Sequence, residues 1–140
     1  MFVTNYLNVK SKVVFIQITT GLAFEKIFLP FVPELVGSII VGMSATDDNQ
    51  FGDNLSNNNI IASQLVLSRI VLNLVAKNKE VVLSDFPIQA LKVKENLTPR
   101  KFITPFYFKF QPELSYIYST RIIPLFPNEV ISVPLQFFYQ

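Results

Sequence analysis

The sequence predicts an all-β fold, an antiparallel eight-stranded β-sandwich whose simplest form is a single jelly roll. Apolar and polar side chains alternate with a period of two through most of the chain, whereas few stretches keep the 3.6-residue period of a helix. These stretches are rich in β-branched and aromatic residues, which suit half-buried strands. Each half-buried sheet needs a second layer against its apolar face, so two packed sheets are expected.

Eight strands are expected, separated by short turns and by proline-containing connections. They are predicted at residues 13–19, 22–28, 36–43, 63–76, 81–87, 102–110, 115–123 and 129–138. With 140 residues the chain has the length of one domain. We therefore expect an N-terminal arm at 1–12 and a single sandwich domain at 13–140.

The longest apolar run, residues 63–76, also fits a helix, because both of its faces are mostly apolar. A turn at 77–80 followed by a second apolar run indicates a β-hairpin and favours the strand. Asn78 is expected to take a left-handed backbone conformation in that turn. Residues 88–91 are expected to form a short turn of helix or a bridge.

Prolines mark places where a strand ladder cannot continue, since each lacks a backbone donor. Pro30 and Pro33 are expected to break the chain between two strands, and Pro134 predicts an edge strand or a bulge at 129–138. Such broken connections favour strands that cross between sheets over a closed up-and-down barrel, which stays an alternative. An immunoglobulin-like sandwich is disfavoured because the chain lacks Cys and Trp.

Residues 45–59 form a long Asn/Asp-rich segment, which predicts an exposed loop. Its aspartates are Asp47, Asp48 and Asp53. The cluster is only faintly similar to a calcium loop, because Phe51 and Asn58 stand where such a loop needs an oxygen ligand and a bidentate Glu. A solvated loop without a metal is the prediction.

The composition argues against enzyme activity. The chain has no His and no Cys, so the usual base near neutral pH and the thiol nucleophile are both missing. No lysine is spaced to activate a serine, and no glycine-rich phosphate-binding motif occurs. We therefore expect no catalytic residues, no cofactor and no metal.

Neither a membrane span nor a nucleic-acid site is expected. The N-terminus lacks the pattern of a signal peptide, and the apolar stretch 27–43 is interrupted by prolines and carries Glu34. The basic residues near Lys92 and Lys101 are expected to form a solvated loop, with no specific binding of nucleic acid.

Charge is scarce while aromatic residues are abundant. Only 16% of the residues are charged, against about 25% in typical soluble domains, and the chain contains 14 Phe and 5 Tyr. Protein interfaces share this depletion of charge and enrichment in aromatics. We therefore expect outward-facing aromatics, Tyr107 and Phe138 among them, to contact neighbouring subunits.

In its predicted strand number, size and composition, from about residue 13 to residue 138, the chain resembles the single jelly-roll capsid proteins of tailless icosahedral viruses. It is most similar to the small vertex, or penton, subunits of membrane-containing phages. The resemblance implies a structural virion protein that is assembled in the host cytoplasm. It implies a homo-oligomer, in the family a pentamer, that contacts other capsid proteins close to an internal membrane. It also implies that the two chain ends contact neighbouring subunits, which adds Phe2, Tyr6 and Tyr139 to the expected interface.

Two alternatives remain open. The first is a non-catalytic binding module, an adhesin or carbohydrate-binding domain, that uses the 45–59 loop. The second is a membrane β-barrel, against which Arg69 and Lys109 in mid-strand positions count.

Overall fold

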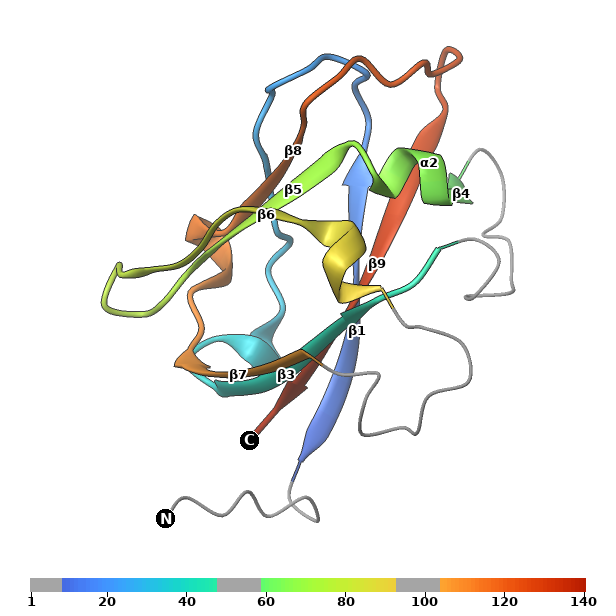
Figure 1. Cartoon of the computed structure of the whole chain (residues 1–140). Helices are drawn as coiled ribbons and strands as arrows, with labels where there is room; N and C mark the ends of the chain where they lie inside the picture. Colours follow the sequence, from blue (N-terminus) through green and yellow to red (C-terminus); the bar gives the residue numbers. More distant parts are fainter. Residues whose placement is uncertain (1–8, 48–58, 93–103) are drawn as a thin grey trace.

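Two β-sheets packed face to face form the molecule (Figure 1). The computed structural model describes residues 9–47, 59–92 and 104–140. Within these ranges the elements are mostly strands, so the predicted all-β sandwich is confirmed.

The first sheet has the order β1 (Lys10–Ile18), β9 (Val130–Tyr139), β3 (Ile39–Ala45) and β7 (Thr104–Lys109), with antiparallel neighbours. The short strand β4 (Asn59–Ile61) also joins β9, and it runs parallel to it. β4 is the strand that the sequence pattern did not predict.

The second sheet has the order β2 (Ile27–Phe28), β8 (Tyr116–Ser119), β5 (Ile70–Val75) and β6 (Val81–Pro87), again antiparallel. Four short helical turns connect the strands of the described segments. They are η2 (Pro33–Leu35), α2 (Gln64–Leu67), η3 (Ile88–Leu91) and η5 (Pro112–Leu114).

The pairing of the strands is nested about one hairpin. Apart from β4, the first strand pairs with the last (β1 with β9), the second with the second last (β2 with β8), then β3 with β7, and β5 with β6. The chain is thus one long hairpin rolled up on itself, and the β9–β3 and β8–β5 pairings complete the two sheets. This winding of eight strands into two sheets is a jelly roll.

The strand order defines two opposite sides of the sandwich, called here flanks. β1 and β2 contact each other and form the first flank. β6 and β7 are the last strands at the other ends of the sheets and form the second flank.

Alternating side chains of both sheets fill the core, as the period of two predicts. Ile16 of β1, Leu72 of β5 and Val133 of β9 are completely buried. On β7 the ring of Phe108 meets Phe110 edge to face, and Phe110 stacks on Phe137 of β9 with centroids 5.1 Å apart.

The turn between β5 and β6 differs in one detail from the prediction. The left-handed residue is Lys79, with φ 68°, and not Asn78. Asn78 instead accepts a hydrogen bond from the backbone N–H of Glu80 through its side-chain oxygen, at 3.0 Å. The asparagine thus stabilises the turn with its side chain, and the next residue takes the positive φ.

Two predicted strands are shorter than expected. In the 22–28 region only Ile27–Phe28 pairs, because Phe24 with φ 63° leaves the extended conformation. The 63–76 run is divided into α2 and β5. The hydroxyl of Ser63 caps α2 by accepting the N–H of Val66 at 3.3 Å, a local contact that period counting does not reveal.

The position of β9 corrects the prediction from Pro134. This strand is central, with β1 on one side and β4 and then β3 on the other. Its pairing with β4 ends at Ser132 and its pairing with β3 begins at Leu135, so position 134 has no ladder partner on that side. The missing N–H of a proline is accommodated where the strand changes partners.

Other boundaries shift by a few residues. β1 begins at Lys10, so part of the expected 1–12 arm belongs to the first sheet, while residues 1–8 lie outside the described residues. β3 begins at Ile39, after the η2 turn and Gly37 with φ 72°. Ala45 and Asn59, the ends of the expected loop, belong to strands, and residues 48–58 lie outside the described ranges.

Lys79→Gly should stabilise the protein by about 1 kcal/mol, because glycine adopts a positive φ without the steric penalty of a side chain. The midpoint of urea unfolding measures this change. Lys77→Gly in the same turn is the matched control and should be neutral or destabilising, since Lys77 has no positive φ. Equal destabilisation by both substitutions would contradict the assignment of the left-handed residue.

Candidate functional site

A row of four aromatic rings covers part of the outer face of the second sheet, next to the first flank. The rings belong, in order, to Phe24, Tyr118, Tyr116 and Phe28. Successive centroids are 5.9, 6.4 and 5.5 Å apart. We call these four residues the aromatic row.

Strand register builds this row. Tyr116 and Tyr118 alternate along β8 with the buried Ile117 and Ser119, so both tyrosines point away from the core. Phe28 is paired directly with Tyr116 across the β2–β8 ladder. Phe24 lies beside Tyr118 because its backbone N–H donates a hydrogen bond of 2.7 Å to the carbonyl of Ser119.

The row is open to solvent. The exposed fraction is 68% for Phe24 and 52% for Phe28, and the two tyrosines are half-buried. Single exposed apolar residues are common, but contiguous apolar patches usually mark interaction sites. The aromatic row is therefore the leading candidate for a functional surface.

Polar groups border the row. The hydroxyl of Tyr118 donates a hydrogen bond of 2.7 Å to Oδ1 of Asp85 on β6. This bond, together with burial and the negative charge of Asp85, raises the pKa of Tyr118 above its usual 10.0. At the other tyrosine, Nζ of Lys26 lies 4.6 Å from the centroid of the Tyr116 ring, within cation–π range.

Asp85 is itself positioned by the sheet. Its N–H donates a 3.0 Å hydrogen bond to Oδ1 of Asn73, whose side chain is 5% exposed. Within the described parts of the chain, the Nδ2 of Asn73 has no hydrogen-bond partner. An unpaired buried amide costs stability, and this cost falls on the residue that holds Asp85 towards Tyr118.

Two loops beside the row expose further large apolar side chains. Leu22, Ile122 and Phe126 are 63%, 69% and 77% exposed. The loops are tied together by a 2.9 Å hydrogen bond from the N–H of Ile123 to the carbonyl of Gly21. Gly21 allows this approach, because a Cβ there would collide with the carbonyl oxygen of Ile123.

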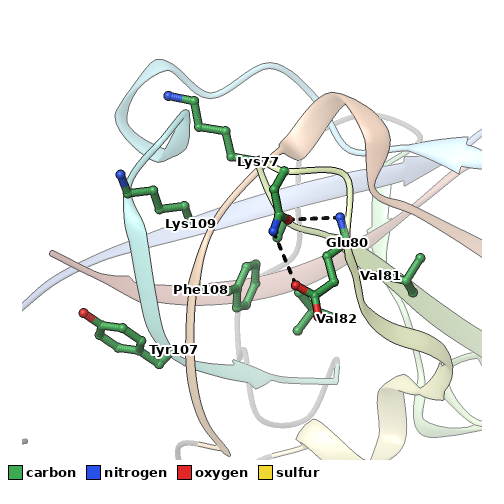
Figure 2. Close-up of a pocket in the computed structure, with 9 residues that line it drawn as sticks. Lys77, Glu80, Val81, Val82, Tyr107, Phe108 and Lys109 are labelled. Atoms are coloured by element: carbon green, nitrogen blue, oxygen red, sulfur yellow. Dashed lines mark hydrogen bonds between the residues drawn. The ribbon is translucent and has the colours of Figure 1, made fainter.

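An open pocket of about 670 Å³ lies on the second flank, between the β5–β6 turn and β7 (Figure 2). Phe108 and Val82 contribute its apolar lining, and Tyr107 lies at one side. Lys77 and Lys109 extend from its rim (Figure 2). It combines an apolar floor with a basic edge.

The structure describes three of the five residues predicted as an interface, Tyr107, Phe138 and Tyr139. Tyr107 is 60% exposed and lies at the pocket. Phe138 is half-buried, and Tyr139 packs against the core. Phe2 and Tyr6 lie outside the described residues.

The sequence prediction missed the aromatic row, although part of its signal was visible. Tyr116 and Tyr118 alternate with Ile117 in the sequence and so were expected on one face of a strand. The contribution of Phe24 and Phe28 depends on the β2–β8 register, which no local pattern contains.

Asp47 corrects the prediction of a solvated loop. Its side chain is 2% exposed and forms an ion pair of 2.6 Å with Nζ of Lys92, itself predicted to be solvated. The backbone explains this, because Ala45 and Lys92 form a parallel bridge that brings the two charges together.

Comparison with family models, with characterised proteins and with solved structures found no match to this chain. In the described parts of the chain, no three His, Cys, Asp or Glu side chains gather as a metal site would require. None of the helices in these parts has the length and apolar character needed to span a bilayer.

Gly21→Ala should destabilise the protein by about 1–3 kcal/mol, as expected for overpacking against a backbone atom that cannot move freely. Chemical unfolding measures the loss, and Thr19→Ala, at an exposed neighbouring position, is the control. If Gly21→Ala has the same unfolding midpoint as the control, then Gly21 and Ile123 do not lie as close together as the structure indicates.

Asp85→Asn should lower the pKa of Tyr118 towards 10.0, because the negative hydrogen-bond acceptor is lost. Because the pKa of Tyr118 is higher in the folded than in the unfolded protein, its hydrogen bond to Asp85 stabilises the protein fully at pH values below the unfolded pKa. This stabilisation is lost as the pH rises through the folded pKa. NMR titration of the tyrosine ring signals measures the shift, with Tyr118→Phe for assignment. An unchanged pKa would contradict the hydrogen bond.

Proposed function

We propose that this chain is a non-catalytic, self-associating structural subunit of a virion, the vertex protein of a tailless icosahedral phage. In this role it forms a homo-oligomer through the aromatic row and contacts the major capsid proteins around it. The observation that carries the proposal is the exposure of four contiguous rings on a jelly roll whose core is already complete.

The energetics favour more than one contact for each subunit. Burying a large apolar side chain completely contributes about 1.5–3 kcal/mol. The rings of the row are already partly covered, so each contributes less, while association costs about 4–15 kcal/mol in lost freedom. A single contact is therefore marginal, and a closed ring, where every subunit has two, is more stable.

The outer surface agrees with a protein partner. Tyrosine and phenylalanine are enriched in the centres of interfaces, where they contribute large contact areas with few rotatable bonds. The loops before β2 and after β8 expose Leu22, Ile122 and Phe126 as further large apolar side chains. A subunit that buries this surface against neighbours needs no catalytic side chains.

The proposal predicts that the purified protein forms a discrete oligomer, and that Phe24→Ser shifts it towards monomer. Light scattering coupled to size exclusion measures the subunit number. Leu65→Ser on α2 is the matched control, because Leu65 is 64% exposed against 68% for Phe24 and lies on a different element.

A monomer at every accessible concentration would overturn this function. Glycan binding that is lost on deletion of residues 48–58 would instead support the binding module. Equal loss of the oligomer with both serine substitutions would show that the aromatic row is not the contact.

A further inference from the structure

The aromatic row and the pocket lie on different sides of one chain. The row contains Phe28 of β2, the edge strand of the second sheet on the first flank. The pocket is lined by β6 and β7, the edge strands of the second flank. We propose that the row of one copy packs into the pocket between β6 and β7 of a second copy.

This inference rests on the proposed self-association and names the two surfaces that meet. The floor of the pocket suits an aromatic side chain, since it contains Ala76 and Phe108, which are 8% and 9% exposed, and the half-buried Val82. A volume of about 670 Å³ accommodates more than one ring. Exposed rings and an open apolar hollow are complementary in shape and in polarity.

The charges around the two surfaces are complementary as well. Lys77 and Lys109 on the pocket rim are exposed, and neither has an ion-pair partner among the described residues. Glu25, next to Phe24 in the row, is likewise exposed and without such a partner within the described chain, whereas its neighbour Lys26 lies over the ring of Tyr116. The acid already present at the pocket, Glu80, is engaged by the side-chain amide of Asn78.

Such an ion pair selects the partner more than it strengthens the contact, because pairs near the surface contribute little energy but exclude like charges. A second copy is favoured over a lipid surface, because only a second copy presents both an apolar hollow for the rings and lysines that attract Glu25. The contact joins two different surfaces and is therefore heterologous, so repetition gives a ring if the rotation closes and an open chain if it does not.

Disulfide trapping tests the inference directly, because the natural chain has no cysteine. Lys26→Cys places a thiol at the row, and Val81→Cys places one at the pocket, where Val81 is 59% exposed. Mixing the two single variants under mild oxidation should give a covalent dimer of one copy of each. Each variant alone should stay uncrosslinked, as should a mixture of Leu65→Cys with Val81→Cys.

Exchange of charges provides an independent readout. Lys109→Glu should reduce the yield of the mixed dimer about fivefold, as expected for the loss of about 1 kcal/mol from an exposed ion pair. Glu25→Lys on the other partner should restore it. Rescue by the exchange of both charges is not expected if either substitution only damages the fold.

Each outcome separates this inference from the proposed function. An oligomer that shows no mixed disulfide leaves self-association intact and overturns the row-to-pocket contact. Efficient crosslinking of Lys26→Cys with itself would show that two rows face each other in a twofold dimer, and it would also overturn the contact. A monomer without any crosslink would overturn both.

Discussion

The occupation of both edges of β9 is the constraint on which the rest of the structure depends. β1 covers one edge over its full length, and β4 and β3 divide the other between them. The second sheet then packs on a first sheet whose central strand is paired on both sides.

Much of this architecture follows from local patterns in the sequence. The alternation in 129–138 and 102–110 predicted the side chains that fill the core, and the turn at 77–80 predicted the central hairpin. Departures from prediction occur where side chains bond to the backbone or where partners change along a strand. Ser63 caps a short helix inside an apolar run, and Pro134 lies where β9 exchanges β4 for β3. The period of the apolar residues reveals neither the helix cap nor the change of strand partner.

The candidate site was less predictable, because it depends on contacts between distant segments. A shortage of charge correctly indicated outward apolar surface, but it did not indicate where that surface lies. The aromatic row combines β8 with a segment about ninety residues earlier, and the partner of Tyr118 is Asp85 on a third element. For Asp47 the prediction was wrong in the other direction. The Asn/Asp-rich segment was expected to be solvated, but Asp47 near its start is buried in an ion pair with Lys92, which only the tertiary structure reveals.

The nested pairing also orders events in time. Local contacts form faster than distant ones, so the β5–β6 hairpin can form early, whereas the pairing of β1 with β9 joins the most distant strands of the roll and forms late. The β2–β8 pairing is nearly as distant, so the face that carries the rings is completed late in folding. A partly folded chain lacks that face, and the topology therefore keeps incompletely folded subunits out of any assembly that uses it.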